Sequence, residues 1–336
     1  MVRYIIRRIL MIIPIILGVT LIVFFLLYTL PGSSIKYMEI DRGGDALDAI
    51  YRFFGAGSNF FTRYIRYCFN IFFHFDFSRS VNFRRNVMHE LAYRGRNTLL
   101  LLLSGVGLTL VVGIPVGAYA AVHKDSKRDR AINIVTLFLS TIPNYAVAIL
   151  LTLILVLYLR LLPLINSYTT PRAFILPALT ISIGGIASIV RMTRTSMLEV
   201  LEKPYITALR SKGLGESSVI YRHALKNALI PVISVLGGLI SQLLFGTLVV
   251  EFFFTVPALG SMMLNSVSVR DHFTILGCTV MLTVILVATN IVADILYALV
   301  DPQIRLRYAG SKVTEIVASG AKIAKGELGK AGGEAK

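Results

Sequence analysis

Few residues of this sequence have the types and spacing that chemistry requires. The phosphate-binding loop of nucleotide hydrolases needs G-x-x-x-x-G-K-[ST]. The nearest string, GELGKAG at Gly326–Gly332, has the wrong glycine spacing and Ala331 in place of a hydroxyl. HELAY at His89–Tyr93 lacks the second histidine of a zinc protease motif, and no nucleophile with an adjacent base is visible. We therefore expect that the chain is not an enzyme and has no catalytic residues, metal site or cofactor of its own.

One polar, cation-bearing stretch interrupts the apolar sequence: YITALRSKGLGESSVIYRHALKNALIP at Tyr205–Pro231. Its first half continues a helical pattern that begins at Thr195. Gly213 and Gly215 then end this pattern, as a helix stop and turn would. A second short helical pattern covers Glu216–Lys226. The sequence therefore predicts a helix–turn–helix elbow on a membrane surface, although spacing alone favours the simpler alternative of a solvated loop between two spans.

The composition is that of a membrane protein. Hydrophobic residues make up 55% and charged residues 15% of the 336 residues, whereas soluble proteins carry about 25% charged residues. A formal net charge of +16 would indicate nucleic-acid binding in a soluble protein, but lysine and arginine collect in the cytoplasmic loops of multi-span proteins. We therefore expect membrane lipid, and no nucleic acid, as a partner. Cys68 and Cys278 lie in a loop and a span, so we expect no disulfide.

Six apolar segments reach the roughly 20 residues that a bilayer-spanning helix needs. The first is too long for the apolar region of a signal peptide, and no cleavage site follows it. The predicted fold class is therefore all-α, a polytopic membrane protein with six transmembrane helices. The spans are expected at Ile9–Leu30, Thr98–Val122, Ala131–Tyr158, from ILPALTISIGG to Val190, at about Ala228–Val250 and at about Phe273–Val300.

These spans divide the chain into four parts. Residues 1–30 contain the N-terminus and the first span, and residues 31–97 form an external loop. Residues 98–308 form a core of five spans that includes the elbow at 195–226. Residues 309–336 are rich in Lys, Glu, Ala and Gly, which predicts a disordered or loosely helical cytoplasmic tail.

Basic residues predict the orientation, because cytoplasmic loops carry an excess of lysine and arginine. The first external loop is set aside, since this rule weakens for connections longer than about 60 residues. The short segments on the elbow side are far richer in basic residues, so both termini are expected in the cytoplasm and the chain in the cell membrane. Those inside are Arg3, Arg7, Arg8, Lys124, Lys127, Arg128, Arg130, Arg191, Arg194, Lys203, Arg210, Lys212, Arg222 and Lys226, and those outside are Arg160, Arg172 and Arg270.

Two local patterns predict helix surfaces. The aromatic stretch at Phe60–Phe77, with Arg63 and Arg66 among its rings, could stack on single-stranded nucleic acid. Rings beside cations also suit the lipid headgroup boundary, and we interpret the stretch as an interfacial helix. In GIPVGAYAA at Gly113–Ala121, small residues four apart allow close approach of a neighbouring helix, and the proline is expected to kink the helix.

Polar side chains within the spans are candidates for a translocation path, because such groups are costly in a bilayer unless they pair or face a cavity. The alternative for each is an interhelical hydrogen bond of up to about 2 kcal/mol. Asp294, near the inner end of the sixth span, is expected to pair with Arg191 or Arg194. The path candidates are Ser140, Asn144, Gln242 and Asn290.

The strings KGL at Lys212–Leu214 and RHALKNALIP at Arg222–Pro231 resemble the cytoplasmic signature loop of binding-protein-dependent ABC importer permeases, in the dipeptide, oligopeptide and nickel branch. DFSRS at Asp76–Ser80, RNTL at Arg96–Leu99 and the Asp-Pro pair that ends the last span extend the resemblance over roughly residues 2–308. The chain is thereby identified as similar to the first of the two permease subunits. It departs from the family pattern at Leu209, Ser211 and Ala258.

The resemblance implies a type I ABC importer transmembrane domain that forms half of a translocation path, for di- or oligopeptides rather than nickel or other small solutes. It implies a second homologous permease subunit, an extracytoplasmic solute-binding protein and two ABC ATPase subunits that bind the ATP. The alternative is a self-sufficient secondary transporter or channel, which would need intramembrane charges or discontinuous helices. The residues expected to dock and couple to an ATPase are Tyr205, Ala208, Leu209, Lys212, Gly213, Leu214, Gly215 and His223.

Overall fold

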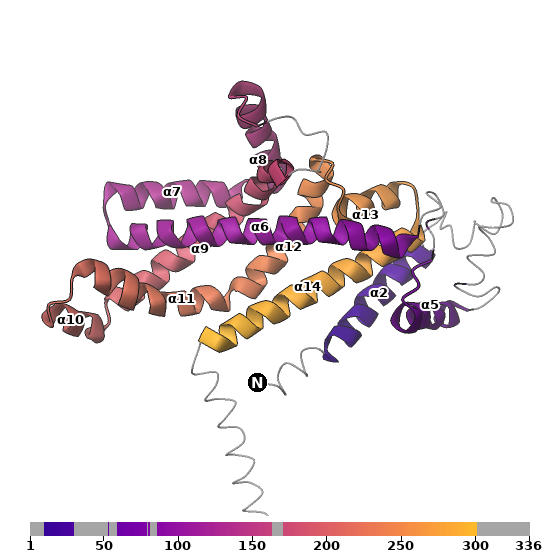
Figure 1. The fold of residues 1–336 in the computed structure, drawn as a ribbon, viewed down its shortest axis with the longest axis horizontal. Helices are drawn as coiled ribbons and strands as arrows, with labels where there is room; N and C mark the ends of the chain where they lie inside the picture. Colours follow the sequence, from indigo (N-terminus) through magenta and orange to yellow (C-terminus); the bar gives the residue numbers. More distant parts are fainter. Residues whose placement is uncertain are drawn as a thin grey trace, which may run out of the picture.

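The computed structural model describes residues 10–29, 53, 59–78, 80, 86–162 and 171–300. These ranges are helical and contain no strand. The predicted tail at 309–336 lies outside the described residues. Figure 1 shows the helices, which are α2 (Ile12–Thr29), α5 (Phe60–His74), α6 (Val87–Val122), α7 (Lys127–Thr141), α8 (Asn144–Leu151), η1 (Thr152–Tyr158), η2 (Pro171–Phe174), α9 (Ile175–Leu201), α10 (Pro204–Ser211), η3 (Ser218–Ala224), α11 (Leu225–Ser234), α12 (Leu236–Phe253), α13 (Leu259–Ser268) and α14 (His272–Val300).

Five of these helices are long and apolar enough to cross a membrane: α2, α6, α9 with η2, α12 and α14. A sixth span results if α7 and α8 with η1 count as one, but this pair is bent by 109°. The bend falls at Pro143, which has no N–H to continue the hydrogen bonds of α7. The all-α, polytopic prediction is therefore confirmed, and the third span expected over Ala131–Tyr158 is broken at the position where Pro143 interrupts its apolar run.

Helices α6 and α9 pack against each other along the centre of the molecule. Their approach is close because a Cβ atom on Gly117 would lie 2.6 Å from the carbonyl oxygen of Val190, and one on Gly113 would lie 2.7 Å from Cγ2 of Ile189. The predicted small-residue contact is therefore confirmed. Pro115 lies inside α6, which continues as a helix beyond it.

Helix α6 begins well before the predicted start of its span at Thr98. The Asn86 side chain accepts a hydrogen bond from the backbone N–H of Met88 at 2.9 Å, which caps the helix. The additional turns carry Glu90 and Arg94, which form an ion pair four residues apart. The extension therefore carries charged side chains beyond the apolar part of the helix.

Helix α5 packs on α2 at the end of the molecule where α6 begins. Phe24 of α2 is fully buried against the rings of Phe60, Tyr64 and Tyr67, and the Tyr64 hydroxyl donates a hydrogen bond of 2.6 Å to the carbonyl of Leu17. The helix predicted within the aromatic stretch is confirmed, and its contact with lipid stays a prediction. Its outer face presents a row of exposed apolar side chains spaced four residues apart, which are Phe61, Ile65, Phe69 and Phe73.

Candidate functional site

The elbow predicted at 195–226 projects from one end of the helix bundle, where α10 is its outermost helix (Figure 1). The uninterrupted helix expected from Thr195 onward is wrong. A turn over Glu202–Lys203 separates α9 from α10, because Pro204 is the first residue of α10 and cannot donate the hydrogen bond that would extend α9. The elbow is therefore built from the end of α9, the short α10 and the helix that follows.

Gly213 reverses the chain at the tip of the elbow. Its φ angle of 78° lies in the left-handed region, which glycine adopts without the steric cost of a Cβ atom. Its N–H donates to the carbonyl of Arg210 at 2.9 Å. The predicted helix stop is thus confirmed. The second helix begins at Glu216 as expected but does not end at Lys226, since α11 runs on through Pro231.

The inner face of the elbow is apolar and packs on the end of α6. Ile206 of α10 and Val219 of η3 are fully buried. They belong to one cluster with Met197 of α9 and with Ala118 and Ala121 of α6. Burial of these groups stabilises the elbow as one rigid unit rather than a flexible loop.

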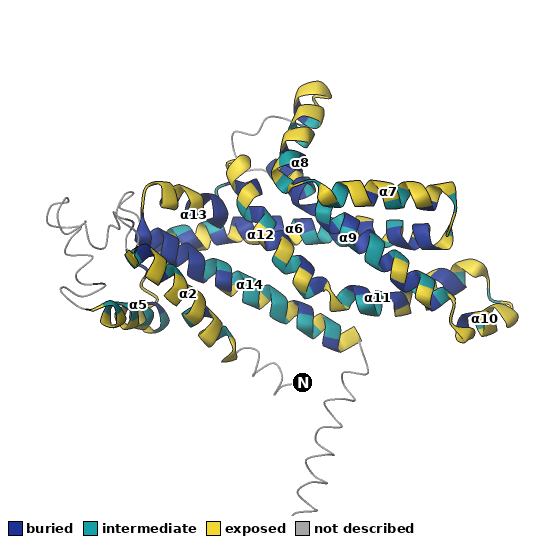
Figure 2. Cartoon of the chain, turned by 180° about the vertical axis from the view of Figure 1, so that it is seen from behind, coloured by how far each residue is buried: buried dark blue, intermediate teal, exposed yellow. Residues whose placement is uncertain are grey.

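The outer face of the elbow is exposed (Figure 2). Its two helices are linked by a hydrogen bond of 3.1 Å from Asn227 to the hydroxyl of Tyr205. Among the residues predicted to couple to an ATPase, the exposed ones are Tyr205, Ala208, Lys212, Gly213 and Gly215, and the half-buried ones are Leu209, Leu214 and His223. The structure thus places all eight on one projection, and their docking role stays a prediction.

An ion pair closes the turn at the tip. Both Nε and Nη2 of Arg210 donate to the carboxylate of Glu216, at 3.2 and 2.6 Å. These hydrogen bonds lower the pKa of Glu216 and raise that of Arg210. Both side chains are about half exposed, so solvent screening makes the pair a local clamp rather than a large source of stability.

Behind the elbow, α9 is tied to α7 by a buried ion pair that sequence analysis missed. Arg194 donates to both carboxylate oxygens of Asp129, at 2.6 and 2.7 Å. Arg191 donates to the hydroxyl of Ser140 at 3.1 Å. The two arginines considered as partners of Asp294 thus both reach α7. The spacing of Ser126 and Asp129 is a helix-start signal that could have marked Asp129 as more than a loop residue.

The four path candidates fall into two groups. Asn290 of α14 donates to the hydroxyl of Ser241 at 3.1 Å, which is the interhelical hydrogen bond considered as its alternative. Ser140 accepts from Arg191. Asn144 instead packs over Gly246 of α12, where a Cβ atom would lie 2.6 Å from its Nδ2.

Gln242, the fourth candidate, is exposed and lies one turn before Gly246 on the same face of α12. Asn144 and Gln242 therefore lie close to one side of α12, whereas Ser140 and Asn290 are engaged in contacts between helices. None of these placements tests whether a solute passes them.

The sequence matches the family described as binding-protein-dependent transport system inner membrane component, over residues 113–306. The chain belongs to this family. Among its relatives are the oligopeptide transport system permease protein AppB of Bacillus subtilis, 35% identical over 90% of this chain and 99% of the relative, and the dipeptide transport system permease protein DppB of the same organism, 33% identical over 92% and 100%. The glutathione transport system permease protein GsiC of Escherichia coli is 30% identical over 91% and 100%.

The family match covers the elbow, the four path candidates and the α6–α9 contact at Gly113 and Gly117. It identifies the chain as a multi-pass membrane permease component, as the resemblance implied. The start of α6, with Glu90 and Arg94, precedes the matched residues.

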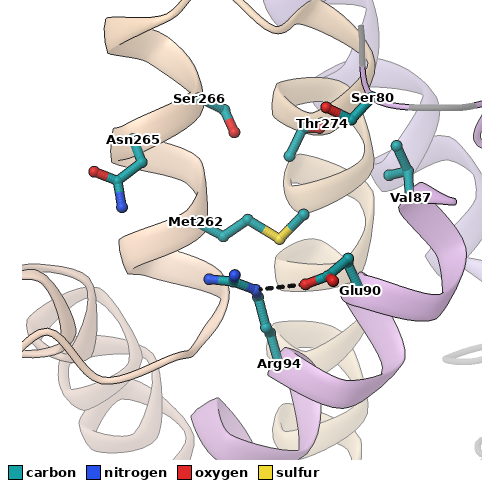
Figure 3. A pocket seen from close by; sticks show the side chains of 8 residues that line it. All are labelled: Ser80, Val87, Glu90, Arg94, Met262, Asn265, Ser266 and Thr274. Atoms are coloured by element: carbon teal, nitrogen blue, oxygen red, sulfur yellow. Dashed lines mark hydrogen bonds and ion pairs between the residues drawn. The ribbon is translucent and has the colours of Figure 1, made fainter. Parts of the chain in front are cut away.

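Two neighbouring cavities lie at the end of this permease opposite the elbow. The first, of about 230 Å³, lies between α6, α13 and α14 (Figure 3). The second, of about 750 Å³, is bordered by α8, α12 and α13. Arg94 and Asn265 line both cavities. They are therefore the side chains at the boundary between the smaller and the larger cavity.

The loop from α12 to α13 beside these cavities is fixed by buried hydrogen bonds. Asn97 donates to the carbonyl of Pro257 at 2.7 Å, and the N–H of Leu259 donates to Thr98 at 3.0 Å. The N–H of Gly260 donates to buried Glu251 at 2.6 Å. Ala258, which departs from the family pattern, has an extended backbone with φ −133° that any residue adopts. These hydrogen bonds hold the part of the loop that lines the larger cavity.

Proposed function

We propose that this chain is one of two homologous permease subunits of an ATP-driven importer for short peptides. The relatives named as oligopeptide, dipeptide and glutathione permeases support this substrate class. In this proposal both termini and the elbow face the cytoplasm, and the cavities at the opposite end face the outside. An extracytoplasmic binding protein delivers the peptide there, and two ABC ATPase subunits bind the ATP that this chain has no motif to bind.

The elbow would act as the mechanical link to one ATPase. Its exposed tip would occupy a groove on that subunit, and closure of the ATPases on ATP would move it. Because its two ends continue into α9 and α11, and because its apolar inner face is packed on α6, a displacement of the tip would be transmitted to the bundle. ATP would thereby shift the population between inward-open and outward-open states.

The observation that carries this proposal is the two-sided construction of the elbow. Ile206 and Val219 anchor its inner side, while Ala208, Lys212 and Gly213 are exposed on its outer side. A loop that merely connects two spans does not require a rigid, buried inner face. A docking element does, because force can be transmitted only through a stiff contact.

The test is peptide uptake by proteoliposomes that contain the complete transporter. Lys212→Glu reverses the charge at the exposed tip, and Lys127→Glu makes the same change at an exposed position at the start of α7. We expect Lys212→Glu to uncouple ATP hydrolysis from uptake and Lys127→Glu to leave uptake unchanged. Gly213→Trp should uncouple as well. Undiminished uptake with both elbow variants would contradict the proposal.

A further inference from the structure

Arg94 lies at the boundary of the two cavities. Its Nε donates to Glu90 at 3.0 Å, and its side chain is 26% exposed. Within the described chain, the terminal nitrogens Nη1 and Nη2 form no hydrogen bond or ion pair. In Figure 3 this end of the guanidinium points away from Glu90, into the space in front of α13.

A guanidinium held in this way is matched to an oxyanion. Its planar fork presents parallel N–H donors that fit the two oxygens of a carboxylate. Removing a charge from water is costly unless it is paired, and Glu90 pairs only the Nε side. The contact with Glu90 also fixes the orientation of the fork. A second carboxylate would complete the hydrogen bonds of Arg94.

Two further polar groups lie near the same space. The carboxamide of Asn265 and the hydroxyl of Ser266, both on α13, form no side-chain hydrogen bond with the described residues, and both line the smaller cavity. Asn265 also lines the larger cavity, as Arg94 does. A ligand that binds Arg94 can thus also receive a hydrogen bond from Asn265.

The larger cavity has a different character. Tyr145 of α8 and Val249, Phe252 and Phe253 of α12 line it, so its surface is mostly aromatic and apolar. Its volume of about 750 Å³ lies within the range of roughly 300–1,000 Å³ for small-molecule sites. Val249 and Phe253 continue the face of α12 that carries Gln242, so the cavity lies at the end of that line of residues.

We propose that Arg94, with Asn265, binds the C-terminal carboxylate of a short peptide, while the variable side chains of the peptide occupy the larger cavity. This proposal rests on the proposed function. A carboxylate is common to all peptides with a free C-terminus, so one fixed anchor beside an apolar chamber accepts many sequences. Glu90 offsets part of the positive charge, which keeps the hold weak enough for release, as transport requires.

An acidic side chain of the binding protein is the other possible carboxylate. The geometry favours the peptide, because Arg94 is half-buried at the wall between two cavities, whereas a protein docks on exposed surface. Arg96 provides the matched control. It lies two residues further along α6, is exposed, and lines neither cavity. Arg96→Gln therefore removes the same charge from the same end of the permease.

The experiment uses the complete purified transporter without its binding protein, and a tri-alanine probe with a photoreactive N-terminal group. Unlabelled tri-alanine and its C-terminal amide compete for labelling of this subunit. We expect the free acid to compete at a concentration at least ten-fold lower than the amide. Arg94→Gln should abolish this difference, Arg94→Lys should restore part of it, and Arg96→Gln should preserve it.

Three outcomes would overturn the site. The first is equal competition by the free acid and the amide in the wild type. The second is a difference between acid and amide that Arg94→Gln leaves unchanged. The third is a transporter in which Arg94→Gln weakens binding of the added binding protein but leaves peptide labelling intact, which would assign Arg94 to protein docking. ATP-driven peptide uptake is measured on the same variants after they are reconstituted in liposomes together with the binding protein. Uptake without acid preference refutes only the site, whereas wild-type transporter that takes up no peptide refutes the proposed function.

Discussion

The close approach of α6 and α9 gives a prediction whose magnitude follows from the structure. In Gly117→Ala, the added Cβ atom would lie 2.6 Å from the carbonyl oxygen of Val190, about 0.8 Å short of the 3.4 Å of an ordinary contact. Because the obstacle is backbone, the two helices must separate. Overpacking of this kind costs about 1–3 kcal/mol. Gly107→Ala is the matched control, since no atom lies within 4 Å of its added Cβ.

Both substitutions gain about 0.5–1 kcal/mol from the higher helix propensity of alanine, so their difference isolates the cost of overpacking. Thermal unfolding of the purified transporter, followed by the loss of soluble complex, should give a melting temperature for Gly117→Ala that is about 1–4 °C lower than that of Gly107→Ala. Equal melting temperatures, or a more stable Gly117→Ala, would refute the reasoning.

Three further predictions concern the elbow and its support. Gly213→Ala should destabilise the tip of the elbow by about 1 kcal/mol because the φ angle of this residue is positive. Hydrogen exchange at the tip should therefore be about five-fold faster. Gly215→Ala is the control and should match the wild type, since no atom lies within 4 Å of its added Cβ. The hydrogen bond from Arg210 lowers the pKa of Glu216 in the folded elbow. The stability that Glu216 contributes to the elbow is therefore present above the pKa of the unfolded state and is lost as the pH falls through the lowered pKa of the folded state. Proteolysis of the elbow should therefore accelerate below pH 4.5 in the wild type and be fast at every pH in Glu216→Gln. Asp129→Asn leaves the half-buried Arg194 without its ion-pair partner and should destabilise the transporter by about 2 kcal/mol in thermal unfolding.

Local signals were sufficient for much of the fold. The apolar lengths predict the spans, and Gly213 predicts the reversal of the elbow, because a helix that must turn back needs a residue tolerant of positive φ. Pro204 carried an equally local signal, since proline favours the first turn of a helix. The helical pattern around it was given more weight, and the break between α9 and α10 was missed for that reason.

Contacts between distant residues could not be predicted in the same way. The Asp129–Arg194 pair joins two helices across a long separation in sequence. The spacing of Ser126 and Asp129 indicates a helix start, but it does not indicate which residue Asp129 pairs with. Arg94 and Asn265 come together only because α13 folds back over the start of α6. A cavity forms through such packing between distant segments, so no local pattern of residues predicts it.

The most direct test of the central claim is a cross-link from the elbow to an ATPase. A photoreactive phenylalanine derivative is placed at exposed Ala208, and at exposed Lys127 as the control, in a complete transporter that imports peptides with ATP. We predict an adduct with an ATPase subunit from position 208, with a yield that changes when ATP is bound, and none from position 127. A transporter that imports peptides with ATP but gives no ATPase adduct from position 208 would contradict the account.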